Sequence, residues 1–446
     1  MSTSEQADSV DAGRAARKLV TRTALGQWQP GPDRADPVGI LEQQATTRVP
    51  ELVRIRYARM ATGQFPFYRG APAIMAADLA AGPETGLTVQ LCGDAHLSNF
   101  GLFASPERAL VFDLNDFDET LPGPFEWDVK RLAASVAVAA RANGFDDIAA
   151  GASARASATA YREAMAQLAT LGETEVWYEM VNAQEVAAVL RPQEGKTVEK
   201  AINKAKSRTS LQALDKLTEP GPDGTPRIKP DPPLVLPISE IEEADLDSVL
   251  ADYRASLPEE RRVLLDRYQL RDLAMKVVGV GSVGTRCFIA LLTGRATGDP
   301  LFLQVKQAET SVLANHLRAS AFRHQGHRVV HGQRLTQAAG DIFLGWATGP
   351  DGHFYYWRQL RDMKGTITID DMSPQQLSQY ANLCGRTLAR GHARSGDRVA
   401  IAAYLGESDV FDRAIADFAL AYADQTATDY AALLTAIDLG RIDAAT

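Results

Sequence analysis

Three features that mark common protein classes are scarce or missing in this sequence. Cysteine is rare, because Cys92, Cys287 and Cys384 are the only 3 among 446 residues, and they lie far apart. They form neither a disulfide framework nor a CxxC pair, which favours a reducing compartment. No stretch approaches the roughly 20 apolar residues that a membrane-spanning helix requires. We therefore expect a cytoplasmic protein that has no membrane partner.

Positive charge is scarce as well. Lysine and arginine number 47 against 56 aspartates and glutamates, which gives a net charge of −9. Because nucleic-acid binding needs a basic surface for phosphate contacts, we expect no nucleic-acid partner. The acidic surface also favours a neutral or cationic small molecule as ligand. Apolar residues make up 45% of the chain, which is ordinary globular composition and allows a sizeable core.

Composition divides the chain into five parts. The first is polar and ends in QPGPDRADP, and the third contains GPDGTPRIKPDPPLVLP, whose prolines and glycines exclude a helix or a central strand. The expected parts are a flexible N-terminal arm (1–37), a helical lobe with the catalytic and metal loops (38–190), an insertion or linker (191–260), a β-rich small lobe (261–370) and C-terminal helices that complete the large lobe (371–446).

Periodicity predicts the elements within these parts. In the helical lobe, QFPFYRGAP should interrupt a helix, and short strands are expected at 87–92 and 108–115. In the small lobe, the stretch 272–308 indicates three strands joined by two turns. A helical region (309–339) and two further strands, DIFLGWAT and HFYYWRQL, should follow. A helix is expected at about 374–392.

A glycine-rich loop lies between the first two strands of the small lobe. Gly279, Gly281 and Gly284 fit GxGxxG, but strand-forming residues follow them, whereas a Rossmann fingerprint requires a helix there. A strand–glycine loop–strand unit covers phosphates in kinases, because glycine lets backbone N–H groups approach phosphate oxygens. The next strand ends in Lys306, the residue type that holds the α- and β-phosphates. The alternative interpretation is a hairpin with glycine turns and a surface lysine.

The predicted nucleotide contacts come from the glycine loop, from Lys306 and from a segment after the last strand of the small lobe. They comprise Gly279, Gly281, Ser282, Gly284 and Lys306, together with the backbone of Gln359, Leu360 and Arg361 as the adenine-binding segment.

A second chemistry-bearing segment is GDAHLSNFG. Asp94 and Asn99 stand in D-x-x-x-x-N spacing after a predicted strand, and Asp116 follows the next strand. Phosphoryl transfer needs a carboxylate to accept the substrate hydroxyl's proton, and Mg²⁺ favours carboxylate and amide oxygens. The alternative interpretation is a pair of acidic turns whose side chains cap the backbone. The conjunction with the glycine loop and Lys306 favours the catalytic interpretation, with ATP and Mg²⁺ as cofactors.

The string LCGDAHLSNFGLF…ALVFDLNDFDETLPGPFEWDVKRL resembles the aminoglycoside-phosphotransferase and choline-kinase branch of the protein-kinase-like fold. This resemblance implies an α+β bilobal fold, with Asp94 as catalytic base, Asn99 and Asp116 as metal ligands and Asp128 as a structural aspartate. With FPFYRGAP, GTRC and HARSGD added, the chain also resembles a bacterial domain-of-unknown-function family over most of its length.

The chain departs from the kinase pattern in the order of its parts. The glycine loop and Lys306 follow the catalytic loop instead of preceding it, so we predict a circularly permuted kinase-like fold. Permutation is permissible where termini fall at exposed loops. The helix glutamate that usually pairs with the lysine is also missing, which leaves Glu309 or an altered pairing, for example through Gln333.

The remaining candidates have structural alternatives. Arg69 could hold a phosphate or an acidic group, or be a packed structural arginine, and the packed role is favoured. His96 is expected to brace the catalytic loop rather than bind metal. His392 and Asp397, in GHARSGD, are expected to serve helix capping, although permutation would bring them near the cleft.

Three functions compete on this evidence. The first is an ATP–Mg²⁺ phosphotransferase that acts on a hydroxyl group of a small molecule. The second is a nucleotide-binding pseudokinase or an adenylyl transferase on the same fold, kept open by the missing glutamate. The third is a metallophosphoesterase, suggested by GDAH but lacking the further histidine motifs of that class. The sequence leaves the acceptor and the oligomeric state open.

Overall fold

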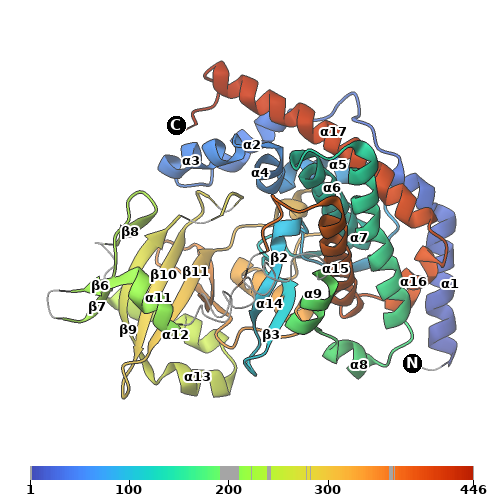
Figure 1. The fold of residues 1–446 in the computed structure, drawn as a ribbon. Coiled ribbons are helices and arrows are strands. Elements are labelled where there is room, and N and C mark those ends of the chain that lie inside the picture. The colour runs from blue at the N-terminus through green and yellow to red at the C-terminus, as the bar shows by residue number, and fades with distance from the viewer. Residues whose placement is uncertain are drawn as a thin grey trace.

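The computed structural model describes residues 3–190, 210–221, 224–238, 243–277, 279–281, 283–360, 365 and 367–444. A helical body and a β-rich region lie side by side, joined by a group of short helices (Figure 1). The α+β class with antiparallel sheets is therefore confirmed. Ser282 and Arg361, two of the predicted nucleotide contacts, lie outside the described residues. Among those residues, none of the helices combines the length and the apolar character needed to cross a membrane.

Residues 3–37 do not form a loose arm, which corrects that prediction for the described part of the segment. They contain α1 (Thr3–Leu19) and a 3₁₀ helix (Arg22–Gly26), and α1 packs along α16 (Arg398–Leu405). Arg17 Nε donates a hydrogen bond to the carbonyl of Tyr404 at 2.8 Å. The 3₁₀ helix buries Leu25 completely. A polar composition concealed these anchors, because a few contacts suffice to fix a helix against a larger body.

Four short helices follow, namely α2 (Pro37–Ala45), α3 (Pro50–Met60), α4 (Gln64–Gly70) and α5 (Pro72–Ala80). The predicted interruption is present, because α3 ends at Met60 and residues 61–63 are not helical, but most of QFPFYRGAP is itself helical, as α4. Pro66 lies in the first turn of α4, and Pro72 begins α5. Proline is tolerated there because the first N–H groups of a helix have no partner within it.

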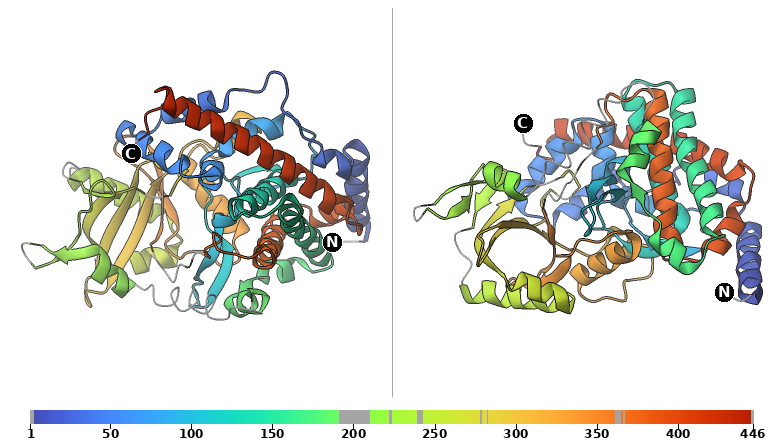
Figure 2. Two further views of the ribbon diagram at one scale, coloured as in Figure 1. Left: turned by 45° about the horizontal axis from the view of Figure 1, so that its top comes forward. Right: turned by 60° about the horizontal axis from the view of Figure 1, so that its bottom comes forward.

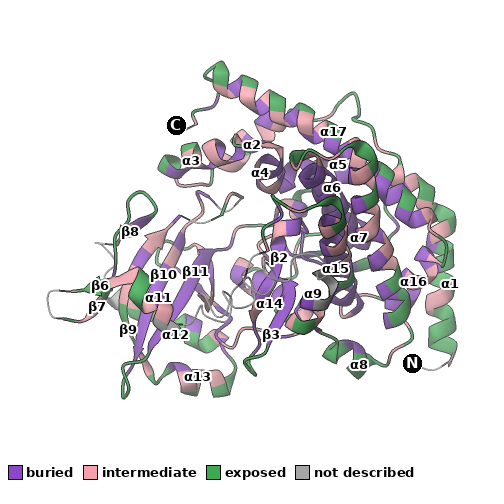
Figure 3. Cartoon of the chain, in the orientation of Figure 1, coloured by how far each residue is buried: buried purple, intermediate pink, exposed green. Residues whose placement is uncertain are grey.

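The helical body is built around α6 (Phe125–Ala142), which is buried on almost every side (Figure 3). Its alanines allow close approach of α7 (Asp147–Leu168), α15 (Pro374–Ala393) and α17 (Val410–Asp438). The short helices α8 (Glu173–Tyr178) and α9 (Ala183–Leu190) follow α7. The predicted helix at about 374–392 is confirmed as α15. Helices from both ends of the described chain thus share one core.

Two small antiparallel sheets lie against this body and position the loops of interest. One pairs β1 (Thr88–Leu91) with β4 (Leu121–Pro124), and the other joins β2 (Phe100–Ala104), β3 (Leu110–Leu114) and β5 (Val181–Asn182). The predicted strands at 87–92 and 108–115 correspond to β1 and β3. Because β1 and β4 are paired, the loop after β1 and the loop before β4 meet at the same end.

The β-rich region is a six-stranded antiparallel sheet in the order β12-β13-β11-β10-β9-β8. The five strands predicted in the small lobe are confirmed as β9 (Tyr268–Lys276), β10 (Cys287–Gly294), β11 (Pro300–Gln307), β12 (Gly345–Thr348) and β13 (Phe354–Gln359). Between β11 and β12 the chain forms a short 3₁₀ helix (Val312–Asn315) and α14 (Gln325–Thr336). Both views in Figure 2 agree with Figure 1 in placing α14 between the sheet and the body.

The described part of 191–260 belongs to the β-rich region. Its elements are α11 (Ser210–Leu217), β6 (Thr218–Pro220), β7 (Pro226–Ile228), β8 (Val235–Pro237) and α12 (Glu243–Ser256), with α13 (Glu259–Leu265) following. As the prolines require, β8 is an edge strand. Helices α11 and α12 take part in two separate apolar clusters of the sheet, one on each face. The segment therefore covers the sheet as well as connecting the two regions.

Candidate active site

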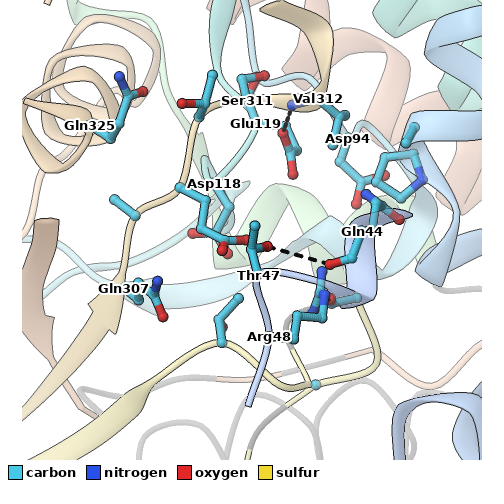
Figure 4. A pocket seen from close by; sticks show the side chains of 18 of the residues that line it. Gln44, Thr47, Arg48, Asp94, Asp118, Glu119, Gln307, Ser311, Val312 and Gln325 are labelled. Carbon is cyan, nitrogen blue, oxygen red and sulfur yellow. Dashed lines mark hydrogen bonds between the residues drawn. The ribbon is translucent and has the colours of Figure 1, made fainter. Parts of the chain in front are cut away.

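A cavity of about 1060 Å³ lies between the helical body and the sheet. Its size is near the upper end of the roughly 300–1,000 Å³ found for small-molecule sites. We call residues 40–73 that line it the helix wall, and residues 94–99 and 116–119 the loop wall. The glycine loop and the β11–α14 connection close the remaining sides. Figure 4 shows the side chains of Asp94, Asp118 and Arg48 around this cavity.

Asp94 lies on the loop wall, in the turn that follows β1. Its Oδ1 accepts a hydrogen bond from Nε of Arg131 of α6 at 2.9 Å, and Nη2 of the same arginine lies 2.8 Å from that oxygen in an ion pair. Burial raises the pKa of Asp94 to about 6, although Arg131 acts to lower it. The carboxylate is therefore mostly ionised at neutral pH, and Arg131 fixes its orientation.

Asn99 connects the two loops of the loop wall. Its Nδ2 donates to the carbonyl oxygens of Asp94, at 2.9 Å, and Asp116, at 3.2 Å. These bonds use the amide's donors and fix the side chain, so that Oδ1 is the atom left to meet a cation. Asn99 and Asp116 thus come together as predicted, and both line the cavity.

Asp128 lies beneath the catalytic loop, in the first turn of α6. Its carboxylate accepts from the backbone N–H of Cys92 at 2.8 Å and of Gly93 at 3.1 Å. His392 Nε2 lies 3.2 Å from Asp128 Oδ2, and its Nδ1 lies 2.9 Å from the hydroxyl of Tyr161. Asp128 therefore has the loop-bonding contacts expected of a structural aspartate, and His392 supports it from α15.

Lys306 lies at the end of β11, and its side chain is 2% exposed. Its Nζ is 2.6 Å from Asp118 Oδ2 and 3.5 Å from Asp116 Oδ1. Burial acts to lower the pKa of Lys306, but Asp116 and Asp118 raise it well above its usual value, so the lysine is charged. Tyr356 of β13 donates to the other oxygen of Asp118 at 2.6 Å.

The acid partner of Lys306 is therefore Asp118, and neither expected side chain takes this role. Among the residues that the structure describes, Gln333 Nε2 donates to Gln337 and Glu309 makes no ion pair with the lysine. The helix α14 contributes a cation instead: Arg328 donates to the carbonyl oxygens of Asp118 and Glu309, each at 2.8 Å. A short loop after Asp116 thus supplies the acid that a helix supplies in kinases.

The glycine loop lies over the helix wall. Gly279 and Gly284 have φ values of 73° and 95°, which favour glycine because other residues are strained there. A Cβ on Gly281 would lie 3.2 Å from the carbonyl oxygen of Arg69. Gly279 and Gly281 line the same cavity as Asp94 and Asp116. The glycine loop and the loops that carry Asp94 and Asp116 are far apart in sequence, but they lie together at this cavity.

Gln359 and Leu360, the described part of the predicted adenine-binding segment, do not line this cavity, which corrects that prediction. Gln359 N–H donates to the carboxylate of Asp341, and Leu360 N–H donates to Phe302 at 2.8 Å. The side chain of Leu360 packs in an apolar cluster with Leu214 and Leu217 of α11. This happens because α11 supplies apolar side chains to the sheet face that Leu360 adjoins.

The space between Lys306 and Leu360 is filled by polar side chains. Gln304 and Lys306 share one face of β11, since residues two apart in a strand point the same way. Arg358 donates to Gln304 Oε1 and to the carbonyl of Asn115, both at 2.9 Å. A guanidinium group therefore lies next to the segment whose backbone was expected to bind adenine.

The supporting candidates have separate positions. His96 lines the cavity with its Nε2 3.6 Å from Asp94, and burial lowers its pKa well below the usual value. Arg69 lines the cavity from α4, next to the glycine loop. Asp397 accepts from the N–H groups of Val399 and Ala400 and so caps the start of α16, whereas the predicted cap was at the end of the preceding helix. The side chain of His392, predicted to serve the same cap, instead contacts Asp128 and Tyr161.

Metal coordination by acidic and histidine side chains alone finds no support. Among the described residues, no group of three or more His, Cys, Asp or Glu side chains is arranged to hold a metal ion. The oxygens of Asn99 and Asp116 remain suitable for Mg²⁺, which usually takes one or two protein oxygens together with waters and substrate phosphates.

Sequence reasoning missed several side chains of the site. Arg131 and Asp118 lie inside the motif string, and a search for a cation within one helical turn after Asp128 would have found Arg131. Arg48 and Arg56 of the helix wall carry no motif, and only the folded chain brings them to the cavity. Glu119 was also missed. Burial raises its pKa to about 7, and its carboxylate accepts from Val312 N–H at 2.7 Å.

Comparisons with known proteins bear on the whole chain. No curated protein matches it, and no solved structure does. The model of one family, described as "Uncharacterized protein conserved in bacteria (DUF2252)", matches residues 48–436, a span that holds both Asp94 and Lys306. Because this span is well over half of the 446 residues, the chain belongs to that bacterial family.

Proposed function

We propose that this protein is an ATP–Mg²⁺-dependent phosphotransferase that acts on a hydroxyl group of a small molecule. The observation that carries the proposal is the meeting of Lys306 with Asp116, whose Nζ and Oδ1 lie 3.5 Å apart. These residues are 190 positions apart in the chain. Asp94 and the glycine loop line the cavity beside them.

The arrangement of the β-rich region supports a kinase-like, circularly permuted architecture. The glycine loop joins β9 to β10, and Lys306 lies on β11, the third of three consecutive antiparallel strands. Kinases place their glycine-rich loop and phosphate-binding lysine in the same way. Helices before and after this region share one core, as joining the parts in permuted order requires.

The residues of the loop wall suit proton transfer from an acceptor hydroxyl. Asp94 would accept the proton, because it is ionised at neutral pH and its orientation is fixed by Arg131. Asp128 holds the backbone of the loop at Cys92 and Gly93, and thereby keeps Asp94 in place. Positioned general bases of this kind contribute about 10²–10⁴-fold to rate.

Asn99 and Asp116 would hold Mg²⁺, and Lys306 and the glycine loop would bind the phosphates. When bound, the metal would neutralise charge on the transferring phosphoryl group. Asp116 suits this role because its side chain is 37% exposed at the cavity. Lys306 pairs with Asp116 and Asp118, and a bound nucleotide would draw it toward phosphate oxygens.

One observation favours the second candidate, a nucleotide-binding pseudokinase or an adenylyl transferase. The face beyond Lys306 carries the guanidinium of Arg358 and then the side chains of α11, instead of an open apolar slot. A nucleotide that turned its phosphates toward Arg358 would present its α-phosphate to the acceptor. Transfer would then deliver AMP and release pyrophosphate.

The first experiment is a thermal-shift titration with ATP and Mg²⁺. Ligand at 100 times its dissociation constant should stabilise the fold by about 2.7 kcal/mol. The shift should require Mg²⁺ and disappear in Asp116→Ala. Asp438→Ala, an exposed aspartate at the end of α17, is the matched control and should retain the shift.

Two results would separate the candidates. ADP as product, with the γ-phosphate on the acceptor, supports the phosphotransferase, whereas pyrophosphate with AMP on the acceptor supports adenylyl transfer. The absence of any nucleotide-induced shift in wild type would remove both functions.

A further inference from the structure

Three arginines of the helix wall face the cavity without an acidic partner. Arg48 precedes α3, Arg56 lies on α3, and Arg69 lies on α4, and all three line the cavity. Among the residues that the structure describes, none of the three forms an ion pair with a carboxylate. The acids across the cavity are engaged elsewhere: Asp94 pairs with Arg131 and Asp118 pairs with Lys306.

Arg56 is the most enclosed of the three, with 0% of its surface exposed. Its Nη2 donates to Gln44 Oε1 and to the carbonyl of Gly70, each at 2.9 Å. Within the described chain, its Nε and Nη1 have no hydrogen-bond partner. Burial, together with the charge of neighbouring Arg48, lowers the pKa of Arg56 to about 9. A buried guanidinium with two unused donors is costly, since buried charges are normally paired.

Arg48 and Arg69 extend this cluster toward the glycine loop. Arg48 Nη1 donates to the carbonyl oxygens of Gly281 and Val283, while its Nε has no partner in the part of the chain that the structure describes. The same holds for Nε of Arg69. Arg48, Arg56 and Arg69 therefore all line the cavity, and each holds a buried N–H group that has no partner in the described chain.

We propose that Arg48, Arg56 and Arg69 form an oxyanion subsite that binds a carboxylate or phosphate group of the acceptor. This assignment rests on the proposed phosphotransferase function. Guanidinium groups suit such ligands because their planar N–H pairs match the two oxygens of a carboxylate or phosphate. Nucleotide phosphates already have the glycine loop and Lys306 on the β-rich side. The acceptor is therefore an anionic hydroxy compound, such as a hydroxy acid or a phosphorylated alcohol.

The test is a thermal-shift titration with inorganic phosphate, carried out at constant ionic strength. Wild type should show a saturable shift. Arg56→Met and Arg69→Gln should each weaken phosphate binding by about tenfold or more, the effect of losing a charged hydrogen-bonding group. Arg413→Gln, a more exposed arginine on α17 that pairs with Asp409, is the matched control and should leave it unchanged. If Arg56→Met fails to fold, Arg69→Gln carries the test, because Arg69 is less enclosed.

A second arm distinguishes the acceptor's group from the phosphates of the nucleotide. With saturating ATP and Mg²⁺, phosphate should still bind with an affinity within about twofold of its value without nucleotide. Competition between ATP and phosphate, or loss of ATP affinity in the arginine variants, would overturn the acceptor assignment. Absence of a saturable phosphate shift in wild type would overturn the subsite itself. If phosphate binds but ATP does not, the oxyanion subsite stands while the phosphotransferase function falls, so the two failures are distinguishable.

Discussion

The two walls of the cavity differ in how their charged side chains are paired. On the loop wall, Asp94 contacts Arg131 and Asp118 contacts Lys306, so each charge is held in one place by its opposite. On the helix wall, Arg48, Arg56 and Arg69 form no ion pair with a carboxylate within the described residues. Paired groups are fixed before a ligand arrives, which suits residues that must be oriented for chemistry. Unpaired cations in a cavity instead favour a ligand that brings the missing charge.

The largest expected effect follows from removing the carboxylate of Asp94. Asp94→Asn preserves the size of the side chain but removes the proton acceptor, so transfer of the γ-phosphate should fall by roughly 10²–10⁴-fold. The measurement is the initial rate of ADP formation with an accepted substrate. ATP affinity should change little, because the proposed function assigns Asp94 to the acceptor and not to the nucleotide. A variant that retains full activity would show that another group accepts the proton.

Loss of the support beneath the loop should appear mainly as instability. Asp128→Ala leaves the buried N–H groups of Cys92 and Gly93 without an acceptor, and His392 without its carboxylate partner. At about 1–3 kcal/mol for each unsatisfied group, we expect a loss of roughly 3–5 kcal/mol in the free energy of unfolding. Chemical denaturation measures it. Asp397→Ala, which removes a cap at the start of α16, is the control and should cost only about 1 kcal/mol.

The smallest expected effect is on stability and concerns Lys130, a buried cation that does not line the cavity between the two walls. Lys130 of α6 is 3% exposed and lies 4.6 Å from the ring centre of Phe418. Burial lowers its pKa to about 8, although Glu126 acts to raise it. The unfolded chain therefore binds more protons between about pH 8 and the usual pKa of 10.5, so this lysine makes stability rise with pH across that window.

Lys130→Met should remove that rise and stabilise the protein near pH 7 by up to about 3 kcal/mol. Unfolding free energies of wild type and variant, measured between pH 7 and pH 10, provide the test. The two values should converge as pH increases. A variant that is less stable than wild type at pH 7 would show that Lys130 is paired favourably, and would weaken the contrast between unpaired cations with and without a cavity.

Sequence spacing was enough to predict that residues of the loop wall lie together, because that spacing is short and local. Asp94 and Asn99 are five residues apart, and one turn is enough to bring both to the cavity. The strands around Lys306 could also be predicted from the sequence, since alternating apolar residues and glycine turns are typical of hairpins. The kinase-like interpretation of these parts remains a proposal.

The surroundings of the adenine segment and the make-up of the helix wall could not be predicted from the sequence, for physical reasons. The adenine segment was inferred from its place after a strand, and nothing in Gln359 or Leu360 signals that α11 packs there. The helix wall depends on tertiary contacts across more than two hundred residues, such as the bond from Arg48 to Gly281. The net charge of −9 favoured a neutral or cationic ligand, yet a whole-chain sum does not describe one wall of one cavity.

The helical core is built from segments that are far apart in sequence, and this affects how the chain can fold while the ribosome synthesises it. Helices α6 and α7 pack against α15 and α17, and Asp113 pairs with Arg390, 277 residues later. The six-stranded sheet is made between these partners, and its strands pair mostly with their neighbours in the chain. On the ribosome, the sheet can therefore fold as a nested unit while the first helices still expose apolar surface. Premature termination after β13 would release a folded sheet attached to an unclosed helical core, a fragment prone to aggregation.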